Sequence, residues 1–150
     1  SAGDAARAIV IRDAKLLVMK RKKLGQDYTT LVGGRIEAGE KPEVTVIREV
    51  KEETGVYIAR PQLVFIEQAK EPYGTQFIYL CEYVEGEAIL SPSSEEYADH
   101  QTGEDLYFPE WITINDLIRN LAPFRSERLR TEILDAMTGE FPSVPKVWQP

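Results

Sequence analysis

The segment 34–56 constrains the fold of this 150-residue chain more than any other stretch. Pro42 suits the first turn of an α-helix, and Gly55 suits the residue that follows its last turn, so the spacing predicts a helix over 42–54. The side of this helix that is expected to pack on a sheet carries apolar and small residues at helical spacing, namely Val46, Ile47, Val50 and Thr54.

Three carboxylates gather on another side of the predicted helix, because Glu49, Glu52 and Glu53 are three and four residues apart. Like charges at this spacing repel, and the last turns of a helix disfavour negative charge, so stability alone would favour Lys or Arg there. A divalent cation removes this conflict by turning the carboxylates into ligands. An acidic helix face is also ordinary solvated surface in many proteins, so the cluster by itself leaves both interpretations open.

The residues around the helix favour the metal interpretation. Arg48 lies four residues before Glu52 and is expected to hold one carboxylate of the cluster. Gly34 and Gly39 allow the preceding loop to approach a ligand closely and to offer backbone groups to it. Helix, acidic face and glycine loop together indicate a site for a metal ion and a phosphate group.

The kinds of metal that such a site accepts are limited by the composition. Cys81 is the only cysteine and His100 the only histidine, which excludes an internal disulfide and a zinc site built from Cys and His. Any metal must therefore be held by oxygen atoms, and these favour a hard cation such as Mg²⁺, Mn²⁺ or Ca²⁺.

The rest of the chain predicts a mixture of strands and helices. Residues 8–11 and 16–19 are predicted strands joined by a turn at Asp13-Ala14, and residues 29–32 are predicted to lead into a sharp turn at Gly33-Gly34. These elements predict a single domain over residues 1–150, of the α/β class, with a sheet covered by helices. The remaining expected elements are strands at 63–66, 76–80 and 111–112, a loop at 91–105, helices at 116–121 and 126–137, and an extended tail at 139–150.

Charge and hydropathy narrow the classes of function. The net charge of −7 is a poor match for a protein that grips the backbone of a nucleic-acid polymer, since this requires a basic face. A small phosphorylated ligand stays compatible, because a bound cation offsets repulsion locally. No apolar stretch is long enough to span a bilayer and the start lacks the features of a secretory signal, so we expect no membrane contact and a cytoplasmic location.

The segment 34–56 also resembles the signature of a known family. That signature, the Nudix box, reads Gly-x5-Glu-x7-Arg-Glu-aliphatic-x-Glu-Glu-x-Gly-aliphatic, and a pattern with this many fixed positions is far more specific than a lone glycine motif. Segments 8–20 and 104–117 resemble the family more loosely. The chain fills each defined position of the box, with Gly34, Glu40, Arg48, Glu49, Val50, Glu52, Glu53, Gly55 and Val56.

Similarity to this family of Nudix (MutT-like) hydrolases implies a mixed sheet between helices and a pyrophosphohydrolase activity on a phosphoanhydride. It implies Mg²⁺, with Mn²⁺ as a substitute, bound by Glu49, Glu52, Glu53 and the Gly34 carbonyl. Arg48 is expected to orient a carboxylate of the cluster, and Glu40 to stabilise the loop. We further expect substrate contacts from Arg7, Arg21, Gly33, Gly34 and Arg35.

The general base is expected outside the box, on the acidic loop before Trp111. Glu104 is favoured and Asp105 comes next, with Glu95 and Glu96 as further acids on the same loop. Each of these residues is also compatible with an ordinary exposed acid.

The choice of substrate is left open by the sequence. Pro72 suits an ADP-ribose hydrolase of the family, whereas Tyr73 suits a dinucleoside polyphosphate hydrolase. We place a nucleoside diphosphate linked to another group first, as in ADP-ribose, and then a nucleoside triphosphate or a dinucleoside polyphosphate.

Two other classes of function are compatible with the sequence. One is a domain that senses a nucleotide without catalysing a reaction, and the other is a structural module that binds Ca²⁺.

The tail, with Val144, Val147 and Trp148, is expected either to dock on its own chain or to join a partner in a homodimer.

Overall fold

The computed structural model of the chain describes residues 3–71, 74–90, 97, 103 and 105–149. Pro72, Tyr73, Glu95, Glu96 and Glu104 lie outside these residues. No helix in the described ranges is long and apolar enough to cross a membrane.

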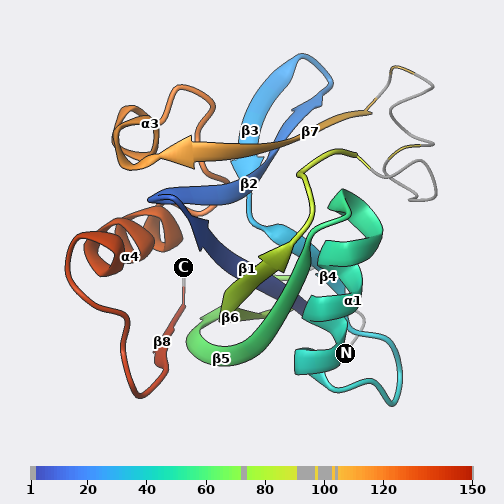
Figure 1. Cartoon of the computed structure of the whole chain (residues 1–150), viewed down its shortest axis with the longest axis vertical. Helices are drawn as coiled ribbons and strands as arrows, with labels where there is room; N and C mark the ends of the chain where they lie inside the picture. Colours follow the sequence, from blue (N-terminus) through green and yellow to red (C-terminus); the bar gives the residue numbers. More distant parts are fainter. Residues whose placement is uncertain (1–2, 72–73, 91–96, 98–102, 104, 150) are drawn as a thin grey trace.

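Strands and helices are mixed along the described chain, as expected for the α/β class (Figure 1). The helices are α1 (Pro42–Thr54), α3 (Ile114–Arg119) and α4 (Glu127–Thr138). The strands are β1 (Ala5–Arg12), β2 (Lys15–Lys23), β3 (Gln26–Thr30), β4 (Val32–Arg35), β5 (Tyr57–Gln68), β6 (Thr75–Glu85), β7 (Asp105–Thr113) and β8 (Lys146–Trp148).

Strand β1 is the centre of the sheet. It pairs antiparallel with β2 and β4 and parallel with β6, so the sheet is mixed. The described strands follow the order β3-β2-β1-β6-β5-β8, with β4 beside β1 and β7 beside β2. Helices α1 and α4 lie on opposite sides of this sheet (Figure 1).

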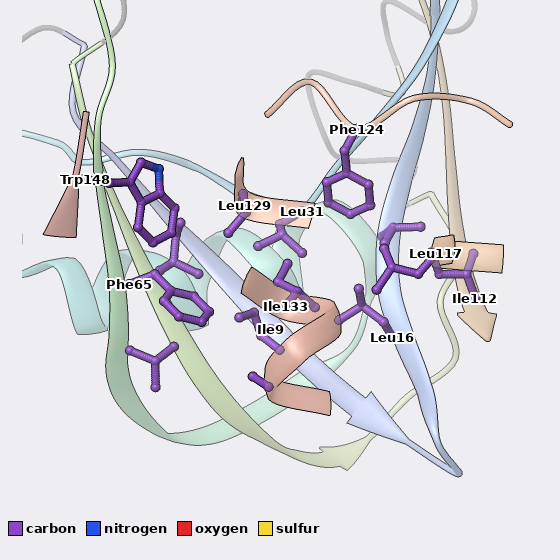
Figure 2. Packing of buried hydrophobic residues seen from close by; sticks show 14 residues of the cluster. Ile9, Leu16, Leu31, Phe65, Ile112, Leu117, Phe124, Leu129, Ile133 and Trp148 are labelled. Carbon is purple, nitrogen blue, oxygen red and sulfur yellow. The ribbon is translucent and has the colours of Figure 1, made fainter. Parts of the chain in front are cut away.

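The two faces of the sheet bury separate apolar clusters because side chains alternate along each strand. On β1, Ala6, Ala8 and Val10 pack with Val46 and Val50 of α1. Between them, Ile9 points to the other face. There it joins a cluster with Leu129 and Ile133 of α4 and with Phe65 and Trp148 (Figure 2).

Two expectations from the sequence are wrong. Gly33 and Gly34 do not form a sharp turn; they lie within β4, where they pair with Arg7 and Ala6 of β1. Ile47 does not pack on the sheet: it is 36% exposed, whereas Val46 and Val50 are fully buried. The predicted strand around Trp111 is present but longer, since β7 begins at Asp105.

The tail docks on its own chain. Strand β8 pairs parallel with β5, and the buried Trp148 donates from Nε1 to Glu67 Oε2 at 2.8 Å. Val144 and Val147 stay exposed. Of the two arrangements expected for the tail, the structure therefore has the intramolecular one.

Candidate active site

Helix α1 begins and ends where the sequence predicts. Pro42 occupies its first turn, and Gly55 ends it in the left-handed conformation, with φ of 76° and an N–H that donates to the Lys51 carbonyl. Burial of Val46 and Val50 fixes the rotation of the helix about its axis. This rotation turns the acidic side of α1 toward β4 and β1.

Strand β4 reaches the carboxylates through its glycines. A Cβ atom on Gly34 would lie 2.5 Å from the carboxyl carbon of Glu49, and one on Gly33 would lie 2.1 Å from the Ala6 carbonyl oxygen. Both distances are shorter than any normal contact. At Gly33 the neighbouring atoms are backbone, so the close approach of β4 to β1 requires glycine; at Gly34 a Cβ would instead displace the carboxylate of Glu49.

A cleft of about 700 Å³ lies between α1, β4, β1 and β2. It brings together side chains and backbone from segments that are far apart in the sequence. All the expected site residues within the described ranges line it, namely Arg7, Arg21, Gly33, Gly34, Arg35, Arg48, Glu49, Glu52 and Glu53.

Arg48 ties the carboxylates of this cleft to the loop before α1. Its Nε and Nη2 form a fork on Glu40, at 2.7 and 2.9 Å. Its Nη1 donates to Glu49 at 3.0 Å and to Glu52 at 3.1 Å. These acceptors raise the pKa of Arg48, with the bond to Glu40 as the largest cause, so its guanidinium stays charged.

Glu40 stabilises the loop before α1 and is not one of the residues that line the cleft. It accepts from the Thr45 hydroxyl at 2.7 Å and from the Glu37 N–H at 3.2 Å, besides the fork from Arg48. The bonds from Arg48 and then Thr45 lower the pKa of Glu40 to about 2.

On the opposite wall, Asp105 holds Arg21 in a second ion pair. Arg21 Nη2 donates to both oxygens of Asp105 at 2.9 Å, and the Tyr107 hydroxyl donates to Asp105 at 3.1 Å. The guanidinium of Arg21 also lies 3.9 Å from the ring centre of Tyr107. These contacts give the Asp105 carboxylate a structural role, since it holds Arg21 in the wall of the cleft.

Arg21 also carries a buried nitrogen, Nε, that has no hydrogen-bond partner within the described ranges. An unsatisfied buried donor is rare in native proteins.

Arg7 faces the carboxylates from β1. Its Nε donates to the Gln76 side chain at 3.3 Å. Burial and then the charge of Arg125 lower the pKa of Arg7 to about 10, while Glu53 and Glu49 act in the opposite direction. At neutral pH Arg7 therefore remains a cation in the floor of the cleft.

Tyr107 and Arg125 lie in or next to this cleft, although the sequence alone assigns neither residue a role in the site. Tyr107 lines the cleft directly, and Arg125 acts electrostatically on Arg7. Neither residue belongs to a local motif. Their positions follow from the pairing of β7 with β2 and from contacts between the chain near 124 and β3.

The chemistry of the donors in the cleft fits a hard divalent cation. Glu49, Glu52 and Glu53 line one cleft with Gly34, and no Cys or His is among the described residues that line it, so the metal ligands on offer there are oxygen atoms. The missing Cβ of Gly34 leaves room for the Glu49 carboxylate. Among the described residues, no three Asp, Glu, Cys or His side chains lie close enough together to hold a metal ion in this structure. Two of the three carboxylates, those of Glu49 and Glu52, are instead bound by Arg48.

Comparison with known proteins finds similarity over most of the chain. The family model described as NUDIX domain matches residues 3–131. A relative named NAD-capped RNA hydrolase NudC, from Deinococcus radiodurans, is 27% identical over 116 residues that cover 77% of this chain and 38% of the relative. The Bacillus subtilis protein named Uncharacterized Nudix hydrolase YvcI is 43% identical over 116 residues, which are 73% of this chain and 64% of that protein.

Among solved structures, a NUDIX hydrolase from Nitrosomonas europaea matches with a TM-score of 0.68 and 20% identity, over 94% of this chain and 92% of that one. This likeness concerns the fold. The chain spans only 38% of the length of the first curated relatives that it matches.

Proposed function

The chain belongs to the Nudix family, and from this premise we propose that it is a Mg²⁺-dependent pyrophosphohydrolase of a nucleotide. The observation that carries the proposal is one cleft with an acidic wall, formed by Glu49, Glu52 and Glu53, and a basic wall that includes Arg7 and Arg21. A phosphoanhydride bound with divalent cations needs both kinds of wall.

The acidic wall is proposed to hold Mg²⁺ through Glu49, Glu52, Glu53 and the Gly34 carbonyl. When bound, this ion supplies charge neutralisation at the anhydride oxygens and a more acidic water. Arg48 positions Glu49 and Glu52 through its Nη1, and its fork on Glu40 fixes the guanidinium itself. The chain thereby orders its own carboxylates before any ligand arrives, which lowers the cost of reorganisation during the reaction.

The basic wall is proposed to bind the phosphate oxygens of the substrate. Arg21 lines the cleft and is held there by the Asp105 carboxylate. Arg7 brings a second charge from β1. Gly33, Gly34 and Arg35 line the same cleft on β4.

We keep Glu104 as the proposed general base. Asp105 comes second, because its carboxylate already accepts hydrogen bonds from Arg21 and Tyr107. If Glu104 takes the proton of the attacking water, Glu104→Gln lowers kcat about a hundredfold or more. Turnover close to that of the unmodified protein would remove Glu104 from the reaction.

The substrate class that we propose is a nucleoside diphosphate linked to another group, of the ADP-ribose type, with nucleoside triphosphates and dinucleoside polyphosphates as the alternative. The relative NudC is named for NAD-capped RNA, and NAD itself is two nucleotides joined by a pyrophosphate. A small nucleotide rather than a polymer agrees with the net charge of −7.

The test is a panel of ADP-ribose, NAD, other nucleoside diphosphate sugars, deoxynucleoside triphosphates and dinucleoside polyphosphates, with Mg²⁺ or Mn²⁺ and with a chelator, and with products separated chromatographically. We expect cleavage at an anhydride that the chelator stops. If the protein binds Mg²⁺ but cleaves no nucleotide of the panel, the proposal is contradicted and a nucleotide-sensing domain is favoured. Binding of Ca²⁺ without binding of Mg²⁺ would favour a structural module.

A further inference from the structure

Arg7 lies between the main cleft and a smaller inner cavity of about 30 Å³, and its side chain lines both spaces. On the side of the cleft, the charges of Glu53 and Glu49 act on its guanidinium. On the other side, the buried carboxylate of Glu67 and the side chain of Arg125 line the inner cavity with it. Charged groups therefore lie on both sides of one guanidinium, and the direction of Arg7 decides whether it can serve a ligand in the cleft.

Strand β6 separates Arg7 from Glu67. It lies between β1, which carries Arg7, and β5, which carries Glu67. Gln76 of β6 is the cross-strand partner of Glu67. All three side chains line the inner cavity, so they point to the same face of the sheet. Gln76 is therefore the polar side chain that stands between the arginine and the buried carboxylate.

The amide of Gln76 also holds Arg7. The Nε of Arg7 donates to Gln76 Oε1 at 3.3 Å, and Gln76 is buried, with 8% of its surface exposed. A guanidinium is planar, so a bond at Nε restricts its plane and does not use the two Nη groups. These Nη groups are the donors that make a forked contact with a phosphate. The bond to Gln76 thus orients Arg7 and leaves that kind of contact possible.

The two arginines of the basic wall are held in different ways. Arg21 donates to both oxygens of Asp105 at 2.9 Å, so a carboxylate balances its charge directly. Gln76 is neutral, so its bond orients Arg7 without forming an ion pair. Burial lowers the pKa of Arg7 to about 10, which still leaves Arg7 protonated at neutral pH. A neutral acceptor suits an arginine whose charge is needed to attract an anion.

We propose that Gln76 is a positioning residue, whose amide oxygen directs the Arg7 guanidinium toward the phosphate groups of a substrate in the cleft and away from Glu67. The inference rests on the proposed function, because it takes Arg7 as a ligand of the substrate phosphates. Gln76 itself does not line the main cleft, so it acts through Arg7. Its loss therefore weakens phosphate binding only while Arg7 is present.

A double-mutant cycle between Gln76 and Arg7 tests this role. The probe is α,β-methylene-ADP with Mg²⁺, whose bridging carbon resists hydrolysis, and its affinity is measured by calorimetry. The variants are Arg7→Gln, Gln76→Met and the protein with both changes. Met has a flexible, unbranched side chain and lacks the amide oxygen.

Two further proteins complete the set. Gln76→Leu removes the amide oxygen with a different shape, and circular dichroism identifies which Gln76 variants keep the fold. Gln62→Met is the matched control, because Gln62 is exposed on the neighbouring strand β5 and lines neither the cleft nor the inner cavity.

We expect Arg7→Gln to bind the probe about tenfold or more weakly, the scale of a lost hydrogen bond between charged groups. Gln76→Met and Gln76→Leu should each weaken binding about three- to tenfold, and Gln62→Met should leave it unchanged. In the Arg7→Gln background, Gln76→Met should cost less than about twofold, since no guanidinium remains to be oriented.

Unchanged affinity of a folded Gln76 variant would overturn the positioning role. So would an equal loss with and without Arg7, which would show that Gln76 serves the fold of the region in general. Failure of the unmodified protein to bind the probe would overturn the phosphate role of Arg7 and the positioning role with it.

These outcomes are separate from the fate of the proposed function. A protein that hydrolyses nucleotides but shows no coupling between Gln76 and Arg7 keeps its activity and loses the positioning role. A protein that shows the coupling but no hydrolysis keeps the role as part of a nucleotide-binding domain.

Discussion

Arg48 determines how the carboxylates of the candidate site are held. Its guanidinium uses Nε and Nη2 for Glu40 and leaves Nη1 for Glu49 and Glu52. The loop and the helix are thus joined through one side chain that is only 26% exposed. Partial burial strengthens such an ion pair relative to one on the surface, so the pairing has measurable consequences for stability.

One consequence concerns the dependence of stability on pH. Arg48 and Thr45 lower the pKa of Glu40 from 4.5 to about 2. A carboxylate whose pKa is lower in the folded state stabilises the fold above its unfolded pKa, and this contribution is lost as pH falls from about 4.5 to about 2. We expect Glu40→Gln to be less stable than the unmodified protein at pH 7, with a difference that shrinks below pH 4.5.

Urea unfolding of both proteins between pH 7 and pH 3 checks this expectation. A difference in the free energy of unfolding that stays constant over this range would show that the charge of Glu40 contributes nothing, and that only the shape of its side chain matters.

A second residue-scale prediction concerns Gly34. A methyl group there would lie 2.5 Å from the Glu49 carboxyl carbon, so Gly34→Ala must displace that carboxylate. We expect kcat to fall about 10²-fold or more, because misplacement of a catalytic group by about 1 Å costs that much. Circular dichroism should show the fold retained.

The control for Gly34→Ala is Gly25→Ala, since a Cβ at Gly25 meets nothing within 4 Å and the residue does not line the cleft. It should cost some stability through its φ of +78° and leave kcat unchanged. Equal activities for Gly34→Ala and the unmodified protein would contradict the proposed role of Glu49.

At the scale of elements, the sequence was most informative where structure is local. The bounds of α1 follow from Pro42 and Gly55, whose effects reach only a turn of helix. The position of Gly33-Gly34 in β4 depends on pairing with β1, more than twenty residues earlier, and the local glycine signal wrongly indicated a turn. Ile47 follows Val46 and so lies about 100° further round the helix, at the edge of the buried face.

The docked tail gives a prediction at this scale. Trp148 is 5% exposed, stacks near Phe65 with ring centres 5.5 Å apart, and donates to Glu67. Trp148→Ala should lower the free energy of unfolding by about 3–5 kcal/mol, the usual range for a buried aromatic residue.

Val147→Ala is the matched control for the tail, because the neighbouring Val147 is 56% exposed. Its effect should stay within about 0.5 kcal/mol in denaturant unfolding. Equal and small effects of both substitutions would mean that β8 contributes little to the fold in solution.

At the scale of the whole molecule, the predicted α/β class is confirmed, and the arrangement of the cleft is what the sequence could not supply. The acidic wall comes from one helix and was visible as a pattern. The basic wall is assembled from β1 and β2, so Arg7 and Arg21 come together only through the sheet. A net charge of −7 conceals this local concentration of arginine.

The same arrangement explains why Tyr107 and Arg125 were missed. Tyr107 is placed by pairing with Arg21, 86 positions earlier in the chain, and Arg125 by backbone bonds to Thr29. Neither position has a composition or spacing that distinguishes it from ordinary surface or core. The pairing of distant strands decides both, and a single sequence does not reveal that pairing.

The central claim is that the acidic wall supports hydrolysis of a nucleotide anhydride. The most direct test measures the rate of product release from ADP-ribose, NAD and a nucleoside triphosphate at saturating Mg²⁺. It compares the unmodified protein with Glu53→Gln and Glu85→Gln. Glu53 is 6% exposed in the cleft, whereas Glu85 is exposed and does not line it. We predict that Glu53→Gln lowers kcat about 10²-fold or more and that Glu85→Gln leaves it unchanged. Equal rates for all three proteins, or no metal-dependent release from any of these nucleotides, would contradict the claim.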